Sequence, residues 1–110
     1  MPDSRRANPS APVFAALGDE SRLRLLTRLS SGPLSISRLT EGSGMTRQGV
    51  TKHLRVLSGA GLVRGTRRGK ESLWRLERNR LEEARRSLDM ISRQWDVALG
   101  KLKRFVEAPD

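Results

Sequence analysis

The chain has 110 residues, of which 35% are hydrophobic and 31% are charged, and it carries a formal net charge of +10. This length predicts one small domain and excludes a separate catalytic domain beside it. The absence of Cys excludes disulfides, thiolate metal ligands and thiol redox switching.

The first twelve residues, MPDSRRANPSAP, combine three prolines with small polar residues and show no apolar period. We therefore expect residues 1–12 to form a disordered N-terminal arm. The ordered domain is expected to span residues 13–107, followed by a short tail over residues 108–110.

Two short helices open the predicted domain and are interpreted as scaffold. The apolar face of the first helix consists of Val13, Phe14 and Leu17. The second helix can begin at Asp19 or Ser21, since either residue can act as an N-cap, and it ends near Gly32. Its expected buried stripe consists of Leu23, Leu25, Leu26 and Leu29.

A short helix, a glycine-containing turn and a longer helix come next. We expect the short helix over roughly residues 35–41, with Ser35 as its N-cap and with Ile36 and Leu39 turned inward. The link Gly42-Ser43-Gly44 is short and permissive, so the following helix must cross the short one at a steep angle. This succession predicts a helix-turn-helix.

The longer helix lies between Met45 and Leu62 and has two contrasting faces. Thr46 can act as its N-cap, and Gly59 and Gly61 suit its end. On a helical wheel, the apolar arc consists of Val50, Leu54 and Leu57. The opposite, polar arc consists of Arg47, Gln48, Thr51 and Arg55.

The polar arc carries side chains that can read bases. Arg can bond bidentately to guanine and Gln to adenine, and a Thr methyl group can contact that of thymine. Taken alone, the arc is explained as well by an ordinary solvated surface, so its neighbours in the chain decide. With a turn before it, we interpret this helix as a DNA recognition helix with that polar arc as its base-reading face.

A basic hairpin follows the recognition helix. Residues 62–66 and 72–76 are strand-like and flank Arg67-Arg68-Gly69-Lys70, which is typical of a solvent-exposed hairpin tip. We expect Trp74 and Leu76 to pack under this wing, with Arg75 outward. The residues expected to contact phosphate from the wing are Arg67, Arg68 and Lys70.

The positive charge is concentrated around these two elements. Residues 47–80 contain ten Lys or Arg and two Glu, which gives a net charge of +8 in 34 residues. Nucleic acid is the usual partner of such a region, because its binding releases condensed counterions. A membrane surface is the rival partner, but the region lacks a long amphipathic helix with bulky aromatic residues. Without an apolar span or a signal-peptide pattern, we expect a cytoplasmic protein with no membrane contact.

The last predicted helix, from Asn79 to about Glu107, carries an apolar seam at alternating steps of three and four residues. The seam consists of Leu81, Ala84, Leu88, Ile91, Trp95, Ala98, Leu102 and Phe105. In a monomer the winged core could cover its N-terminal half, but a helix of this length extends about 40 Å. We therefore expect a homodimer. The residues expected in its interface are Leu88, Ile91, Trp95, Leu99, Leu102, Phe105 and Val106.

Three segments, LGDESRLRLLTRL, MTRQGVTKHLRVLSGAGLV and RRGKESLWRL, follow one another within residues 17–76 of a resemblance that covers about residues 13–107. In order and spacing they resemble the arsenic-repressor-like (ArsR) winged helix-turn-helix regulators of bacteria and archaea. The C-terminal ISRQWDVALGKLKRFVE is similar to a subgroup of that family without metal sites. The resemblance implies a mainly α fold with a small β-hairpin wing and a long C-terminal dimerisation helix.

The resemblance also implies a homodimer joined by its first and last helices on a palindromic operator in double-stranded DNA. It thereby adds Val13, Phe14 and Leu17 to the expected interface. By residue match, the base-reading positions of the family correspond to Arg47, Gln48 and Thr51. Lys52 and Arg55 correspond to positions nearer the phosphates.

Two matched residues have open roles. His53 stands where the family commonly has His, but it lies beside the apolar arc, which favours a structural hydrogen bond over a DNA contact. Arg22 matches an Arg early in the family's second helix, and an ion pair and a phosphate contact are both open.

The metal-responsive members of the family place paired Cys in the third helix, or Asp and His on the last helix. Here the third helix reads SISRLTEG and the last helix has no His. Carboxylates without imidazole or thiolate make a poor transition-metal site, so we expect no metal site and no cofactor.

The leading hypothesis is a sequence-specific repressor that occludes a promoter and is released by an unknown signal other than a metal. A non-specific architectural DNA-binding protein is the alternative, although phosphate contacts alone would need only Lys and Arg. A protein-interaction module is opposed by the cluster of positive charge. An enzyme is excluded, because the chain has one His, no Cys, no Tyr and no suggestive nucleophile–base spacing.

Overall fold

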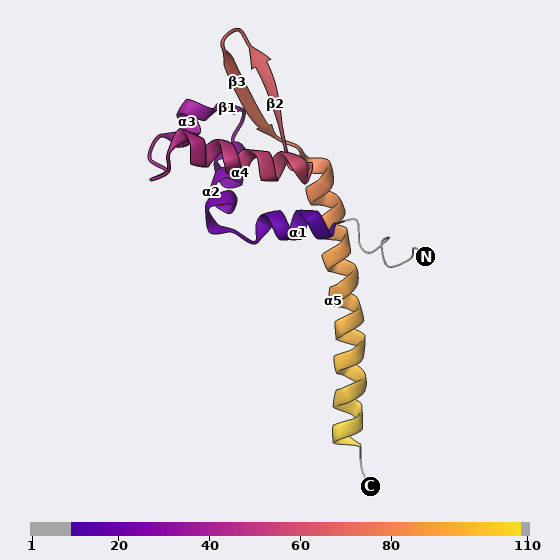
Figure 1. The fold of residues 1–110 in the computed structure, drawn as a ribbon. Coiled ribbons are helices and arrows are strands. Elements are labelled where there is room, and N and C mark those ends of the chain that lie inside the picture. Colours follow the sequence, from indigo (N-terminus) through magenta and orange to yellow (C-terminus); the bar gives the residue numbers. More distant parts are fainter. Residues whose placement is uncertain (1–9, 109–110) are drawn as a thin grey trace, which may run out of the picture.

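The computed structural model describes residues 10–108, which form helices and a three-stranded antiparallel sheet (Figure 1). In chain order the elements are α1 (Ala11–Leu17), α2 (Glu20–Leu29), β1 (Leu34–Ser35), α3 (Ile36–Thr40), α4 (Arg47–Gly59), β2 (Val63–Arg68), β3 (Glu71–Leu76) and α5 (Arg78–Glu107). The predicted fold class, mainly helical with a hairpin wing and a long last helix, is confirmed. Residues 1–9 and 109–110, with most of the predicted arm and tail, lie outside the described residues.

The first helix begins at Ala11, two residues before the expected start of the domain at Val13. Ser10 occupies the N-cap position and is buried, and Pro12 lies in the first turn. A proline there loses no helical hydrogen bond, because the first N–H groups of a helix have no intrahelical partner. Ala11 and Pro12 therefore belong to the first turn of α1 and not to an irregular arm, so the helix begins before the expected boundary after residue 12.

The core lies where helices α1 to α4 meet the inner face of the sheet. Its fully buried side chains are Val13, Leu25, Leu29, Leu39, Val50, Leu54, Leu57 and Leu62. Leu23, which was expected in the buried stripe of α2, is instead 46% exposed. The reason is its position about 160° around the helix from Leu25.

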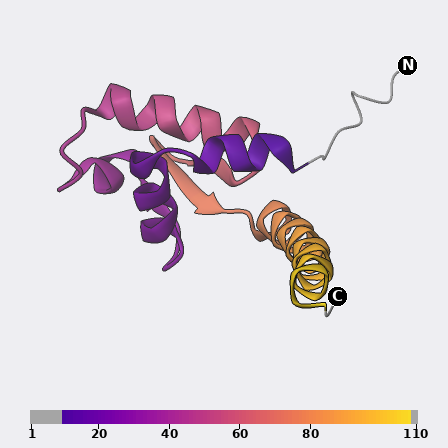
Figure 2. The same cartoon turned by 90° about the horizontal axis from the view of Figure 1, so that it is seen from below.

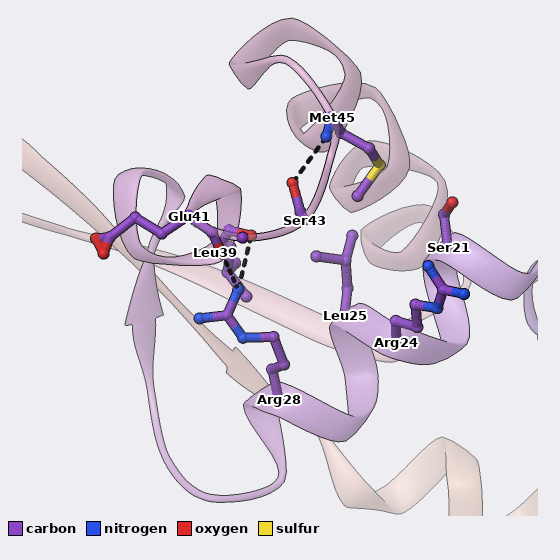
Figure 3. Close-up of a pocket in the computed structure, with 9 residues that line it drawn as sticks. Ser21, Arg24, Leu25, Arg28, Leu39, Glu41, Ser43 and Met45 are labelled. Atoms are coloured by element: carbon purple, nitrogen blue, oxygen red, sulfur yellow. Dashed lines mark hydrogen bonds between the residues drawn. The ribbon is translucent and has the colours of Figure 1, made fainter.

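Two arginines of α2 bind the exposed carbonyl ends of other helices. Arg22 donates from Nε to the carbonyl of Ala16 at 2.6 Å, at the end of α1, and pairs at 3.9 Å with Asp19. The open role of Arg22 is therefore a structural one. Arg28 donates to the carbonyls at the end of α3, and Figure 3 shows its side chain reaching them. Its acceptors are those of Arg38 at 2.8 Å, Leu39 at 2.8 Å and Glu41 at 3.2 Å.

The sheet has the strand order β1-β3-β2. Strand β1 was not predicted; it pairs Leu34 with Trp74, and its second residue, Ser35, also accepts a bond from the Arg38 N–H as the N-cap of α3. Trp74 and Leu76 pack against the core as predicted. Gly65 lies under the Trp74 ring, since a Cβ there would come within 3.1 Å of the ring carbons.

The end of α4 is joined closely to the start of α5. Gly61 adopts a left-handed φ of +78°, and the N–H of Leu62 bonds back to the carbonyl of Leu57 at 2.9 Å, which terminates α4. A Cβ on Gly61 would lie 2.9 Å from Cγ of Arg80 in α5. Glu77, the one residue between β3 and α5, donates its N–H to the carbonyl of Leu62 at 2.8 Å.

Helix α5 runs away from the body, on the opposite side from the hairpin (Figure 1), and Figure 2 views it nearly end-on beside the other helices. Only its first turns meet the core, through Ala84, which is 3% exposed, and Leu81. The 30 residues of this helix give the structure its elongated dimensions of 73 × 37 × 20 Å. No helix among the described residues is long and apolar enough to cross a membrane.

We expect the substitution Arg28→Met to lower the free energy of unfolding by about 1–2 kcal/mol, because three carbonyls lose a charged donor. Arg24→Met is the matched control on the same helix. Its exposed ion pair with Glu20 contributes less than about 0.5 kcal/mol. Urea denaturation measures both variants, and equal losses would contradict the capping role of Arg28.

Asp19 predicts a pH dependence of stability. The bond from the Arg22 N–H, the positive charge of Arg22 and that of His53 lower the pKa of this carboxyl, against a smaller opposing effect of desolvation. Because the folded-state pKa is below the unfolded value of about 3.9, the stabilisation is complete above that value. It is lost as the pH falls through the lower folded-state pKa.

Asn at position 19 retains the cap but does not titrate, so Asp19→Asn isolates this effect. The difference in free energy of unfolding between the two proteins should stay constant from pH 7 to about 5 and shrink below about 4. A difference that persists unchanged to pH 3 would show that the Asp19 charge adds nothing to stability.

Candidate nucleic-acid interface

Helix α4 presents its polar arc to solvent, as expected from the helical wheel. Val50, Leu54 and Leu57 are completely buried beneath it. The exposed side chains are Arg47, Gln48, Lys52 and Arg55, and Thr51 is half-buried. Thr46 caps the helix by accepting a bond from the Gly49 N–H at 3.0 Å. The apolar side therefore fixes the helix on the core and leaves the donors outside.

A shallow, open hollow runs along this polar arc. It is lined by Thr46, Gln48, Gly49, Thr51, Lys52 and Arg55. Three of the four expected base-reading residues thus line one surface together with Lys52, whereas Arg47 does not line it. The hollow combines hydrogen-bond donors, a methyl group and positive charge, which are the groups that base edges and phosphates require.

Arg47 is engaged with the preceding helix. Its Nη1 donates to Oγ of Ser37 in α3 at 2.6 Å, and both side chains are exposed. Binding a guanine would require Arg47 to leave this partner. Ser37 was not identified from the sequence, because its approach to Arg47 depends on the angle between α3 and α4.

Thr51 has a constrained role on the same arc. Its hydroxyl donates to the carbonyl of Arg47 one turn earlier, at 2.8 Å. This bond within the helix occupies the hydroxyl proton and leaves the methyl group for contact. Thymine, through its own methyl group, is the base that this arrangement suits.

The turn between α3 and α4 is held by Ser43. Its hydroxyl donates to the carbonyl of Thr40 at 2.8 Å and accepts from the N–H of Met45 at 3.0 Å. Together with the contacts of Arg28, these bonds position the start of α4. The side chains of Ser43 and Arg28 are both shown in Figure 3.

The wing is longer than expected. Strand β2 continues to Arg68, which pairs with Glu71, so the turn consists of Gly69 and Lys70 alone. The expectation that Arg67 and Arg68 lie at the hairpin tip is therefore wrong, because the strand pairing extends over both residues. Both side chains remain exposed, and Arg67 donates to the carbonyl of Gly69 at 3.3 Å.

His53 lies on the side of α4 that is away from the hollow. It is half-buried, and its charge contributes to the lowered pKa of Asp19 at the start of α2. This position agrees with a structural role better than with a DNA contact.

Helix α5 exposes a long apolar face. Trp95 is 62% exposed and Phe105 is 81% exposed, and this face also includes Leu88, Ile91, Leu99, Leu102 and Val106. The winged core therefore covers only the beginning of the seam. Phe14 and Leu17 of α1 are half-buried, whereas Val13 is 1% exposed. The expectation that Val13 contacts a second subunit is corrected, because its side chain belongs to the core of its own chain.

The described residues contain no group of three or more His, Asp or Glu side chains that could hold a metal ion. Two acidic residues near the start of α5 form ion pairs: Glu82 with Arg85 at 3.9 Å and Glu83 with Arg80 at 3.6 Å.

Comparison with known proteins gives consistent matches. Residues 17–66 match a helix-turn-helix domain family. The HTH-type transcriptional regulator NmtR of Mycobacterium tuberculosis is 42% identical over 74 residues, which are 67% of this chain and 62% of that protein. The HTH-type transcriptional regulator Rv2034 of the same organism is 31% identical over 96 residues, 87% of each chain.

The fold is also similar to that of solved structures. An ArsR-like transcriptional regulator from Rhodococcus sp. RHA1 superimposes with a TM-score of 0.80 and is 36% identical. The similarity covers 92% of this chain and 95% of that one. It therefore includes the hairpin and most of α5, beyond the residues of the helix-turn-helix match.

Proposed function

The chain belongs to the ArsR-like winged helix-turn-helix transcriptional regulators, and from this premise we propose that it is a sequence-specific, dimeric repressor that occludes a promoter. Family membership identifies a DNA-binding regulator and not an enzyme. The observation that carries the finer proposal is the polar arc of α4, which is exposed above three completely buried leucine and valine side chains. The buried side holds α4 on the core and thereby pre-organises the Arg and Gln donors of its polar arc, which are side chains that read bases.

The proposed contacts divide between bases and phosphates. Arg47, Gln48, Thr51 and Arg55 would read base edges in a major groove. Lys52, Arg67, Arg68 and Lys70 would contact the backbone, which positions the protein without reading sequence. In Figure 1 the hairpin rises beside the end of α4, so both elements can lie along one duplex.

The homodimer is proposed from the exposed face of α5. An isolated chain would leave a continuous row of large apolar side chains in water, which monomeric proteins rarely do. A second copy of α5, related by a two-fold axis, is self-complementary to this row. Two copies of α4 would then require a palindromic operator.

A non-specific architectural role is the second candidate. The observation in its favour is the excess of positive charge over residues 47–80, of which only part lies on the polar arc of α4. Competition between a promoter fragment and random DNA at one salt concentration separates the two candidates. Equal affinities would overturn the repressor proposal.

The releasing signal is proposed to be something other than a transition metal. The chain has no Cys and one His. Soft thiolate or imidazole donors are what such metals require. The protein would act on chromosomal DNA in the cytoplasm.

We expect Arg47→Ala to weaken binding to the specific operator by about 1–3 kcal/mol and to relax the preference at one base pair. Lys70→Ala should instead weaken binding to all sequences and reduce the slope of log K against log salt by about 1. Titration of both variants against operator and random duplexes tests this division. If Arg47→Ala weakened binding to both duplexes equally, its base-reading role would be wrong.

We expect Trp95→Glu to produce monomers at micromolar concentration, because a charge would enter the apolar face of α5. Met90→Glu is a matched control, since Met90 is 61% exposed on the other side of the same helix. Sedimentation measures both variants. A dimer that survives Trp95→Glu would place the interface elsewhere.

A further inference from the structure

A cavity lies between α2 and the turn that joins α3 to α4, and it has a volume of about 160 Å³. Its apolar side consists of Leu25 of α2, Leu39 of α3 and Met45, the residue before the N-cap of α4. Figure 3 shows the side chains of Leu25 and Met45 pointing toward one another. None of the residues assigned to DNA contact lines this cavity, but it adjoins the elements that set the direction of α4.

Arg28 lines the cavity and has donors left for a ligand. A guanidinium group has five N–H donors, and three of those of Arg28 bind the carbonyls at the end of α3. The other two, on Nε and Nη2, have no acceptor among residues 10–108. These two nitrogens lie on one edge of the planar group, where both oxygens of one carboxylate can bind side by side.

The positive charge of Arg28 is not neutralised by an acidic side chain in the described part of the chain. Its side chain is half-buried, so solvent screens this charge incompletely. Glu41 also lines the cavity, but Figure 3 shows its carboxylate pointing away from the other side chains there. Arg24 of the lining pairs at 3.0 Å with Glu20, which does not line the cavity. The cavity therefore carries the charge that binds a small anion.

These features define a ligand with an apolar body and one carboxylate. A protein cavity of about 150 Å³ admits benzene, so the volume here suits one aromatic ring. The ring packs on Leu25 and on the Met45 sulfur, since thioethers make favourable contacts with aromatic rings. The carboxylate accepts the two remaining N–H groups of Arg28. The Ser21 hydroxyl, which has no hydrogen-bond partner within the described residues, adds a donor to the lining.

We propose that this cavity binds a small aromatic carboxylate and that the bound ligand strengthens operator binding. The second part of this inference rests on the proposed function. The ligand joins α2 to Met45, while Arg28 keeps its three bonds to the end of α3. A ligand that fits an existing arrangement stabilises it, and this arrangement holds α4 with its polar arc exposed. Ligand and operator therefore favour each other's binding, and loss of the ligand is the releasing signal.

Benzoate is the probe for the site. Its titration into the isotope-labelled protein should shift the amide resonances of Leu25, Ser43 and Met45 to saturation. Benzyl alcohol lacks the charge and acetate lacks the ring, so each loses either the charged bonds to Arg28 or the apolar contacts. Both should bind at least about tenfold more weakly than benzoate at one ionic strength.

The variant Ser21→Leu should lose benzoate binding, because the larger side chain fills the cavity. Ser31→Leu, just beyond the other end of α2, is the matched control, since Ser31 is exposed and does not line the cavity. This control should bind benzoate like the wild type. Arg28→Lys is a second test, because it keeps the positive charge without the fork geometry. It should weaken the binding of benzoate but not that of benzyl alcohol.

The effect on DNA is measured with a duplex that the purified protein selects from a random-sequence library. Saturating benzoate should tighten binding of this duplex about fivefold, compared with sodium chloride at the same ionic strength. Ser31→Leu should show the same gain. Ser21→Leu should bind the duplex like the wild type without benzoate and should gain nothing when benzoate is added.

The site is overturned if benzoate causes no saturable shifts, if benzyl alcohol binds as tightly, or if Ser21→Leu binds benzoate like the wild type. The coupling is overturned if benzoate leaves the affinity for the selected duplex unchanged or lowers it. Failure of the proposed function gives a different result, because the library then yields no preferred sequence while benzoate binding to the free protein is still measured. In that case the coupling falls with the proposed function and the site stands.

Discussion

The arrangement of the DNA-binding helices depends on carbonyl groups that a short helix cannot satisfy by itself. Helix α3 has five residues, so the carbonyls at its end have no intrahelical partner, and a helix this short is not stable alone. Arg28 supplies the missing donors from α2. Arg22 does the same for α1. One helix thus fixes the directions of two others, and α4 takes its angle from the turn that follows α3.

Features of the fold that depend on neighbouring residues were predictable from the sequence. Apolar periodicity identified α2, α4 and α5, and the hydroxyl caps Ser35 and Thr46 were identified because they act within three residues. Features that depend on distant residues were not predictable. Strand β1 has two residues, too few for an alternation, and exists only because β3 lies beside it. The burial of Val13 within its own chain depends on packing partners that periodicity does not reveal, whereas the exposure of Leu23 follows from its angle around α2.

The candidate site shows the same division. The helical wheel predicts which side chains of α4 are exposed, because that follows from the buried side of one helix. It does not predict that Arg47 contacts Ser37, since this contact joins separate helices. The pairing of Arg64 with Arg75 was likewise hidden, because it needs the exact register of the two strands. Local chemistry thus identifies the candidate residues, and their partners come from topology.

The close connection between α4 and α5 means that the long helix and the winged body move as one rigid unit. The start of α5 is fixed in two ways. A single residue joins it to β3, and the side chain of Arg80 packs against Gly61, just beyond the end of α4. Helix α5 is about 45 Å long. If its far end changes direction slightly, the whole winged body tilts with it. Any event that alters how two such helices cross would therefore change the distance between two recognition helices without touching either of them.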